Sequence, residues 1–315
     1  MVRKALILAA LSCLLLGAGG CGGSPKPQPL RIGVLPILDT LPMVVARDQG
    51  LFEEQGVDVE FIPAASAAER DQLVQTGKVD AIITDLVALA LYNRDSPNVV
   101  GVRYAMTPSP GFPQFRVMAS QDAGITQPQE LAGIQIGVSE GTVIEYVTDR
   151  LLEAEGLALS EVETLGVPRI PERMALLRSG ELAAATLPEP LASLALEGGA
   201  VVVVDDAEHP ETSCSLYAFR KATLEDQPDA VRGFLKAVSA ASRAINADKG
   251  RWSDLLAEEN LVPEPLMGSY RLPDYPADEA PTKAQFTDAV AWLQANGRMS
   301  RDPSYTDAVD ASFLP

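Results

Sequence analysis

RIGVLPILDTLPMVVARDQGLFEEQGVDVEFIP, residues 31–63, contains a strand, a helix and a second strand in succession. Residues 31–36 and 57–63 are short apolar runs of the kind that forms buried strands, and residues 40–50 between them have the apolar spacing of a helix. Pro42 lies in the first turn of this helix and Gly50 follows its end, which are favoured positions for both residues. The stretch therefore predicts an α/β fold with a mainly parallel sheet.

The same alternation continues along the chain and then begins again. Residues 66–77 predict a helix, and residues 79–85 and 99–106 predict strands of the same lobe. A second series of elements follows, with strands at 134–139, 162–168, 183–188 and 200–206 and a helix at 142–156. The chain then returns to a strand-like run at 215–222 and to long amphipathic helices at 228–248, 250–260 and 282–297.

This order predicts a second lobe inserted between two parts of the first. We assign residues 30–116 and 217–315 to the first lobe and residues 117–216 to the second. The chain is expected to cross between the lobes at 117–124 and 215–219. Residues 262–281, which are rich in proline and acids, predict a long loop packed on the first lobe.

The first 29 residues have the layout of an export signal and a tether. Arg3 and Lys4 precede an apolar run at 5–16, which is too short to cross a membrane, and glycines lead to Cys21. We expect residues 1–20 to be removed as a signal peptide. The small residues before Cys21 resemble the lipobox of bacterial lipoproteins, although Ala18 stands where leucine is usual. This implies a lipid on Cys21 and a tether at 21–29; the alternative is ordinary cleavage that leaves Cys21 a free thiol.

Composition excludes several classes of site and partner. The chain has 25 basic and 43 acidic side chains, and removal of Arg3 and Lys4 makes the acidic excess 20, which disfavours nucleic acid. The one histidine, His209, excludes sites built on several imidazoles, and we expect no metal and no cofactor. His209 is interpreted as a surface residue, with a pH sensor as the alternative. Cys214 is expected to be buried, and no disulfide is predicted.

Polar and small residues follow the predicted strands at five places. In an open α/β sheet, ligands bind beyond the carboxyl ends of the strands. The candidate ligand-binding residues at these ends are Asp39, Thr40, Ser66, Thr84, Asp85, Ser139, Glu140, Gly141, Thr142 and Glu189. A purely structural role is open for three of them: Ser66 and Asp85 as helix caps and Glu189 as a first-turn acid. Gly141 and Thr142 have the better functional case, because a glycine before a helix lets unpaired amides approach a ligand.

Three stretches carry a resemblance to a known class of proteins. They are residues 33–63, residues 75–90 and residues 130–157. They resemble the substrate-binding proteins of bacterial ABC importers for nitrate, sulfonates, taurine and thiamine-precursor pyrimidines. The pattern A-x-x-x-G-L-F-x-x-x-G at 46–56 and G-x-V-D-A at 77–81 are the most specific parts. The resemblance implies a two-lobed periplasmic-binding-protein type II fold, with two hinge crossings, that closes on a small molecule.

The candidate positions also suggest the charge of the ligand. Asp39, Asp85, Glu140 and Glu189 would repel an anion, so we expect a neutral or cationic nitrogen heterocycle such as a thiamine-precursor pyrimidine. Phe112 is a candidate stacking wall, and Phe115 is a candidate core residue. A sulfonate- or nitrate-type anion stays open through Arg103, Arg116 and Arg173.

These features favour a lipid-anchored monomer outside the cytoplasm that passes a solute to an ABC permease and its ATPase by domain closure. An enzyme on the same fold, of the menaquinone or pyrimidine pathways, is an alternative of another class. Those enzymes use histidine- and cysteine-rich stretches that this chain does not have. A lipoprotein sensor that signals through a receptor is the third interpretation.

Overall fold

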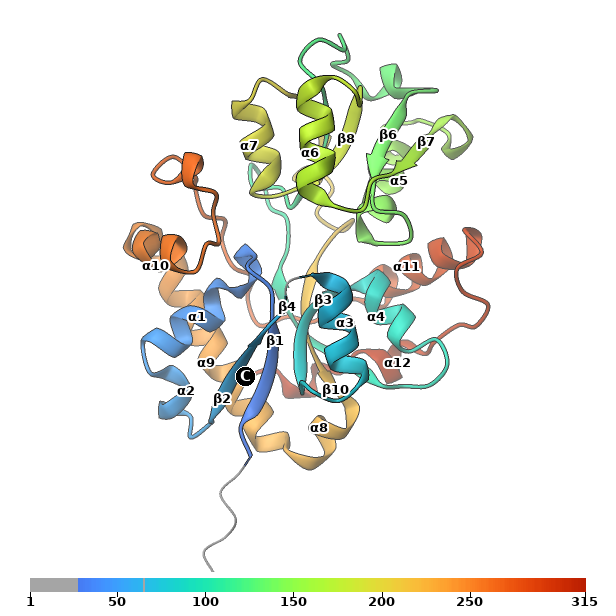
Figure 1. The fold of residues 1–315 in the computed structure, drawn as a ribbon. Helices are drawn as coiled ribbons and strands as arrows, with labels where there is room; N and C mark the ends of the chain where they lie inside the picture. Colours follow the sequence, from blue (N-terminus) through green and yellow to red (C-terminus); the bar gives the residue numbers. More distant parts are fainter. Residues whose placement is uncertain (1–27, 65) are drawn as a thin grey trace, which may run out of the picture.

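The computed structural model describes residues 28–64 and 66–315 (Figure 1). The predicted signal peptide, Cys21 and all but the last two residues of the tether lie outside these residues. The described chain forms two five-stranded sheets, each with its own helices. Figure 1 shows the lobe built on the second sheet, coloured green to yellow, above the lobe built on the first. The predicted two-lobed α/β fold is confirmed.

The first sheet has the strand order β2-β1-β3-β10-β4. Its strands are β1 (Leu30–Val34), β2 (Val59–Pro63), β3 (Ala81–Asp85), β4 (Val99–Met106) and β10 (Ser215–Arg220). β1 pairs in parallel with β2 and β3, and β10 runs antiparallel between β3 and β4. The carboxyl ends of β1 and β3 therefore lie at the same edge as the start of β10, where Ser215 pairs with Asp85.

The second sheet has the order β7-β6-β8-β5-β9. Its strands are β5 (Phe115–Ala119), β6 (Gln135–Val138), β7 (Glu163–Gly166), β8 (Ala184–Pro188) and β9 (Val201–Asp205). β6 pairs in parallel with β7 and β8, while β5 runs antiparallel between β8 and β9. The two sheets thus repeat one topology, with a single antiparallel strand second from one edge of each.

The helices follow the predicted ranges closely. In the first lobe they are α1 (Leu41–Asp48), α2 (Leu51–Glu54), α3 (Ala67–Gln75), α4 (Leu86–Tyr92), α8 (Lys221–Asp226), α9 (Pro228–Ala247), α10 (Ser253–Glu258), α11 (Lys283–Ala295) and α12 (Tyr305–Ala308). In the second lobe they are α5 (Val143–Ala154), α6 (Ile170–Ser179) and α7 (Leu191–Glu197). Short 3-10 turns supplement them, among them η1 (Leu38–Thr40) and η5 (Glu264–Leu266).

The chain crosses between the sheets at 107–114 and 206–214, and the expected crossings at 117–124 and 215–219 were wrong. Residues 117–119 belong to β5 and residues 215–219 to β10. Val117, Met118 and Ala119 are fully buried, because β5 lies inside the second sheet between β8 and β9. The lobe boundaries at 116/117 and 216/217 stay a prediction, since β5 and β10 begin at Phe115 and Ser215.

One buried carboxylate joins the two crossings. Asp206, fully buried, accepts hydrogen bonds from the backbone nitrogens of Gln114 at 2.8 Å and Phe115 at 3.2 Å, and from the hydroxyl of Ser213. Burial raises the pKa of Asp206 to about 6, against these hydrogen bonds, which lower it. The two crossings therefore share one fastening point beside the second sheet.

Two large apolar clusters hold the first lobe together. One lies between the first sheet and helices α1 and α9, where the Phe234 ring packs against Phe52 at 5.4 Å and Phe219 at 5.6 Å between centroids. The other lies on the opposite face, under α4 and α11, and continues into the second lobe through α5. Tyr146 of α5 and Trp292 of α11 meet edge to face at 5.6 Å in this cluster. Trp252 and Trp292 are both buried in these clusters.

Polar contacts reinforce the junction of α5 with α11. Asp288 accepts hydrogen bonds from the Tyr146 hydroxyl at 2.7 Å and from Nε of Arg150 at 2.8 Å. The indole nitrogen of Trp292 donates to Asp149 at 2.7 Å. α11, near the carboxyl end of the chain, therefore fastens one flank of the second lobe to the first (Figure 1).

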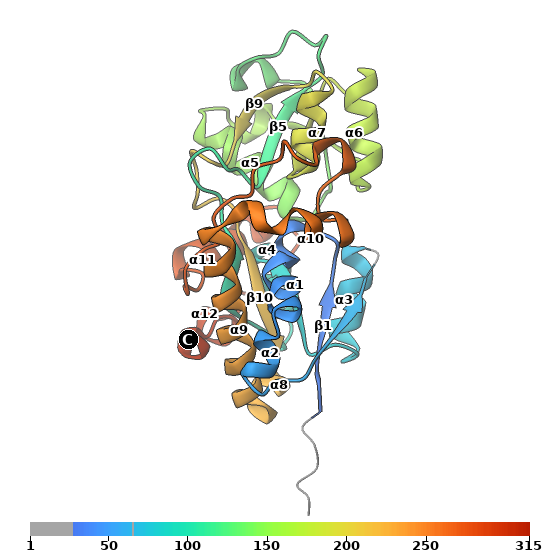
Figure 2. The ribbon, with the colours of Figure 1, turned by 90° about the vertical axis from the view of Figure 1, so that its left-hand side faces the viewer.

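Residues 262–281, which we call the strap, fasten the other flank. The strap was predicted to pack on the first lobe, and Leu266 and Leu272 do join the first core cluster. It also reaches the second lobe: η5 packs against α7, and the Ser269 hydroxyl lies 3.5 Å from a carboxylate oxygen of Glu197. Figure 2 shows this orange segment beside both lobes. The strap therefore contacts two lobes and not one.

A test of the first core is offered by Gly233 in α9. A Cβ at this position would lie 2.4 Å from Cγ2 of Val57, although alanine is otherwise favoured in a helix. Gly233→Ala should lower the free energy of unfolding by about 1–3 kcal/mol through overpacking, measured by urea unfolding.

The matched control is the double variant Gly233→Ala/Val57→Ala, which removes the obstructing methyl groups. The double variant should be more stable than the sum of the two single effects. Additive effects would contradict the close approach of α9 to Val57.

Candidate functional site

The site begins where β1, β3 and β10 end or start at one edge of the first sheet. Asp39 and Thr40 lie in η1 just after β1, Asp85 ends β3, and Ser215 begins β10. Thr40 is buried and donates its hydroxyl to the carbonyl of Leu35 at 2.8 Å, so its side chain is used within the turn.

Asp39 is surrounded by tyrosines. Burial raises the pKa of the Asp39 carboxyl to about 6, and the nearby Ser215 hydroxyl partly offsets this rise. The Asp39 charge in turn contributes to the raised pKa values of Tyr217, Tyr270 and Tyr275, for each of which burial is the main cause. The hydroxyl of Tyr275 donates to the carbonyl of Leu38 at 2.8 Å, which fixes this ring beside Asp39.

Two hydroxyls near Asp39 are buried without an aligned hydrogen bond. They belong to Ser215 and to Tyr217, whose residue is only 1% exposed. Buried polar groups in proteins nearly always have a partner, and a group without one calls for an explanation such as a bound molecule. The two hydroxyls and Asp39 therefore form the candidate ligand site of the first lobe.

Glu189 brings the second lobe to the same place. It follows β8, lies 2.8 Å from Nε of Arg116, and accepts the Ser193 hydroxyl at 2.6 Å. Arg116 Nε and Glu189 Oε1 are close, but neither has an aligned hydrogen bond in the described part of the chain. Burial raises the pKa of the Glu189 carboxyl, while Arg116 lowers it.

Tyr270 of the strap connects these two acids. Its hydroxyl lies 3.5 Å from Oε2 of Glu189, and its pKa responds to both Glu189 and Asp39. The structure thus brings together Asp39 of the first lobe and Glu189 of the second, through a tyrosine that the sequence did not single out. Ser215, Tyr217, Tyr270 and Tyr275 were all missed as site residues; only the strand-like run at 215–222 hinted at the first two.

Ser66 and Asp85 both cap helices. The Ser66 hydroxyl accepts the backbone nitrogen of Glu69 at 3.2 Å, and the Asp85 carboxylate accepts that of Ala88 at 2.9 Å. The cap interpretation is confirmed for both. Burial raises the pKa of Asp85, which the charge of buried Arg70 lowers. The Thr84 hydroxyl oxygen is buried without a partner among the described residues.

The loop at 139–142 uses its polar groups within the protein. The Gly141 backbone nitrogen donates to Glu145, and the Thr142 hydroxyl donates to the Ser139 carbonyl at 2.6 Å while it caps α5. Arg298, just after α11, reaches the same Glu145 carboxylate at 2.8 Å. Glu140 is exposed and lies against Gly166. The contacts of this loop therefore run to Glu145 and Arg298 and not to Asp39.

Phe112 lies on the first crossing with cations beside its ring. Nζ of Lys249 is 5.1 Å and the guanidinium carbon of Arg271 is 5.6 Å from the ring centroid. Both are distances of cation–π contacts, which link the crossing to the 3-10 turn η4 (Lys249–Trp252) and to the strap. The structure gives Phe112 this role in addition to the predicted role of a stacking wall.

The three arginines of the anion alternative have different surroundings. Arg103 pairs with Asp278 at 2.8 Å, and Arg116 pairs with Glu189. Arg173 is fully buried, donates to carbonyls of Thr186 and Val167 and to the Ser139 hydroxyl, and has one nitrogen, Nη2, without a partner among the described residues. Burial lowers the pKa of Arg173 to about 10.

The described residues contain no group of three histidine, cysteine, aspartate or glutamate side chains arranged to hold a metal ion. Among these same residues, no helix has the length and apolarity needed to span a bilayer. Cys214 is a buried free thiol, as predicted, and burial raises its pKa. His209 lies 3.0 Å from Glu155.

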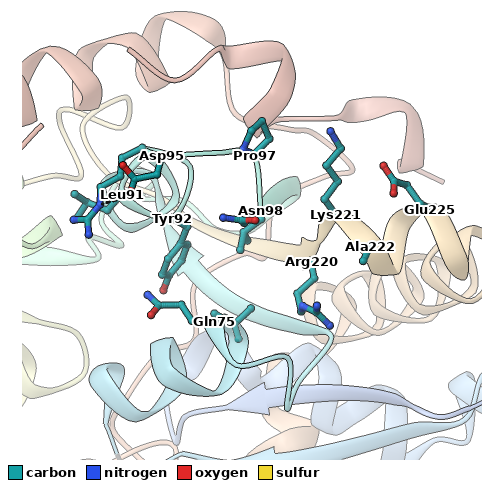
Figure 3. Close-up of a pocket in the computed structure, with 13 residues that line it drawn as sticks. Gln75, Leu91, Tyr92, Asp95, Pro97, Asn98, Arg220, Lys221, Ala222 and Glu225 are labelled. Carbon is teal, nitrogen blue, oxygen red and sulfur yellow. Dashed lines mark hydrogen bonds and ion pairs between the residues drawn. The ribbon is translucent and has the colours of Figure 1, made fainter. Parts of the chain in front are cut away.

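A separate depression of about 580 Å³ lies at the opposite edge of the first sheet (Figure 3). Its wall includes the carboxyl ends of α3 and α4 and the start of α8, with Tyr92, Arg220 and Lys221 among the labelled side chains. Val99, the first residue of β4, and Arg220, the last of β10, both line it. It therefore lies at the far end of β4 and β10 from the edge that carries Ser215 and Met106.

Two lobes that present polar strand ends to each other across two crossings define the class of two-lobed solute-binding folds. The chain belongs to the family described as NMT1/THI5 like, whose model matches residues 38–249. No curated protein is significantly similar to the chain in sequence.

Solved structures of binding proteins share the fold. The periplasmic aliphatic sulphonate binding protein SsuA from Escherichia coli is 19% identical with a TM-score of 0.76 over 90% of this chain and 92% of its own. The periplasmic nitrate-binding protein NrtA from Synechocystis PCC 6803 is 12% identical with a TM-score of 0.68 over 92% and 88%. The desulfurization enzyme DSZB is 16% identical with a TM-score of 0.67 over 91% and 98%. The resemblance to binding proteins of nitrate and sulfonate importers is confirmed.

Ionisation of Asp39 should make the ligand-free protein less stable as pH rises. Its pKa is about 6 when folded against an ordinary 3.8, so the folded state binds more protons than the unfolded chain between about pH 4 and 6. Stability must fall across this window, by at most about 3 kcal/mol. Asp39→Asn should remove that fall, measured as urea unfolding free energies at pH 4.5 and 7.5.

Asp206 stays in both proteins, so its own contribution cancels in the comparison. Asp122→Asn, a change of an exposed acid in a loop, is the matched control and should keep the wild-type pH dependence. The buried placement of Asp39 is contradicted if Asp39→Asn and wild type lose the same stability between the two pH values.

Proposed function

We propose that this protein is a lipid-anchored, monomeric solute-binding protein that delivers a small molecule to an ABC permease and its ATPase. The observation that carries the proposal is the pair of buried hydroxyls of Ser215 and Tyr217 near Asp39, neither of which has an aligned hydrogen bond among the described residues. A bound solute would give these groups the partners that they lack. The contact of Tyr270 with Glu189 supports closure of both lobes on that solute.

The solute that fits these groups contains nitrogen and is neutral or cationic, such as a pyrimidine of the thiamine-precursor type. Asp39 and Glu189 are acceptors for N–H groups, and Tyr270 and Tyr275 supply ring surface. Arg103 and Arg116, the arginines nearest to these tyrosines and acids, already pair with Asp278 and Glu189. An anion at Asp39 would therefore meet uncompensated negative charge.

A sulfonate- or nitrate-type anion is the second candidate, and one observation favours it. Arg173 is buried without a carboxylate partner in the described part of the chain, and its Nη2 atom has no acceptor. An anion that reached Nη2 would satisfy it. Such a ligand would sit against Ser139 and the second sheet, not against Asp39.

A transport role is favoured over catalysis, although DSZB shares the fold and the fold alone does not decide. The one histidine, His209, faces Glu155 of α5, and the thiol of Cys214 is buried with a raised pKa. Neither is placed as a nucleophile or as a general base beside Asp39. Turnover of a bound solute by the purified protein would overturn this part of the proposal.

Binding should make the protein more compact. Native mass spectrometry of undialysed protein should find a small molecule bound, and its return to stripped protein should reduce the radius of gyration in X-ray scattering. At 100 times the dissociation constant it should also stabilise the fold by about 2.7 kcal/mol.

Asp95→Asn, a change in the depression at the far edge of the first sheet, is the control and should bind as wild type does. Methanesulfonate and nitrate serve as the anion arm of the same titrations, and tight binding of either would favour the second candidate. A protein that neither retains a solute nor contracts with any metabolite of a broad panel would not be a solute-binding protein.

Anchoring should depend on Cys21, which lies outside the described residues. We propose that the mature chain begins at Cys21 and that residues 21–29 tether the lobes at 30–116 and 217–315 and at 117–216. Cys21→Ser should move the protein from the membrane fraction to the soluble fraction of the cell envelope. Cys214→Ser is the matched control and should stay membrane-bound; equal distribution of both variants would contradict lipidation of Cys21.

A further inference from the structure

We propose that the solute is bound as an organic cation, with its charged nitrogen held between the Asp39 carboxylate and the hydroxyls of Ser215 and Tyr217. This inference rests on the proposed function and names the substrate class of the same site. The acids at the strand ends are compatible with a neutral or a cationic solute, and we select the cation.

The charge of Asp39 is not balanced by any ion pair in the described part of the chain. The nearest arginines are already neutralised: Arg103 binds Asp278 at 2.8 Å, and Arg116 lies 2.8 Å from Glu189. Among the described residues, Asp39 has no ion-pair partner, and the nearby Ser215 hydroxyl only partly offsets the rise in its pKa. Asp39 is half-buried, so ionising its carboxylate without a counter-charge is unfavourable, and a cationic ligand supplies the missing charge.

Two hydroxyls near Asp39 have no aligned hydrogen bond among the described residues. The Tyr217 hydroxyl is buried at 1% exposure without a partner, and the Ser215 hydroxyl is buried without an aligned one. In the register of the first sheet, Ser215 and Tyr217 are two residues apart on β10, so their side chains point to the same face. The Ser215 hydroxyl lowers the pKa of Asp39 and the Asp39 charge raises that of Tyr217, so both hydroxyls lie near this carboxylate.

Two tyrosine rings of the strap lie near Asp39. Tyr270 and Tyr275 come from the strap, and the pKa values of both respond to the charge on Asp39. Tyr275 is held by its bond to the Leu38 carbonyl, and Tyr270 approaches Glu189 at 3.5 Å. Tyrosine faces beside a carboxylate are the surroundings that bind ammonium and other organic cations.

A neutral solute would satisfy only part of this arrangement. It could donate an N–H to a hydroxyl, but it would leave the carboxylate uncompensated. An anion would add a second negative charge next to the first. The distinction can therefore be measured with ligands that share one shape and differ in charge.

The test uses three probes of nearly one shape: 1-methylnicotinamide, which is a permanent cation, nicotinamide, which is neutral, and nicotinate, which is an anion. Calorimetric titration of the full mature protein at pH 7.5 should give at least tenfold tighter binding of 1-methylnicotinamide than of nicotinamide. Nicotinate should bind most weakly.

Two variants separate the charge from the rest of the site. Asp39→Asn should weaken binding of 1-methylnicotinamide at least tenfold and leave that of nicotinamide within twofold. Tyr217→Phe keeps the ring, removes the hydroxyl and should weaken the cation several-fold. Asp122→Asn is the control and should change neither affinity.

The inference is overturned if 1-methylnicotinamide does not bind up to 10 mM, if nicotinamide binds as tightly, or if Asp39→Asn keeps the cation affinity within twofold. The proposed function is judged separately, by the co-purified solute and the change in radius. A co-purified solute without positive charge that still contracts the protein would leave the transport role standing and remove the cation. Absence of any solute and of any contraction would remove the transport role itself.

Discussion

The two-lobed architecture depends on one buried carboxylate. The chain leaves the first sheet after β4 and returns to it at β10, and Asp206 fastens both passages by accepting bonds from Gln114, Phe115 and Ser213. Because both crossings are bonded to this carboxylate, we expect them to move together when the lobes open or close. Burial of a carboxylate is unfavourable unless its oxygens accept hydrogen bonds. Both oxygens of Asp206 accept them, from backbone nitrogens and from the Ser213 hydroxyl.

Two other contacts limit how the lobes move about that point. On one flank, α5 packs on α4 and α11 in an apolar cluster that continues from one lobe into the other. On the other flank, the strap reaches α7 and Glu189 through two polar contacts of 3.5 Å, and Leu194 of α7 is the apolar side chain of the second lobe that packs on the first core cluster there. Apolar packing resists separation more than isolated polar contacts do, so opening is expected to pivot at α11 and to part the lobes at the strap. Glu189 lies on the side that parts, 3.5 Å from the Tyr270 hydroxyl, whose pKa the charge of Asp39 also raises.

The sequence predicted the elements well and the site only in part. Strands such as residues 99–106 are buried on both faces, and their apolar runs are visible in the chain itself. The second half of β5 was taken for the start of a crossing, and only its pairing with β8 and β9 identifies it as part of a strand. Asp39 and Glu189 were predicted because they follow strands. Tyr270 and Tyr275 could not be predicted, because nothing in a proline-rich loop shows which lobe it will touch. Conversely, the loop at 139–142 has a suitable sequence, but Glu145, one turn further along α5, occupies its amide.

The occupied amide has a consequence for the binding of inorganic anions. Phosphate, sulfate and chloride can each bind a free backbone amide at the start of a helix. Here the chain supplies its own anion, Glu145, and balances it with Arg298 from the far end of the sequence. The amide at the start of α5 is therefore satisfied within the chain, and inorganic anions find no free donor at this position.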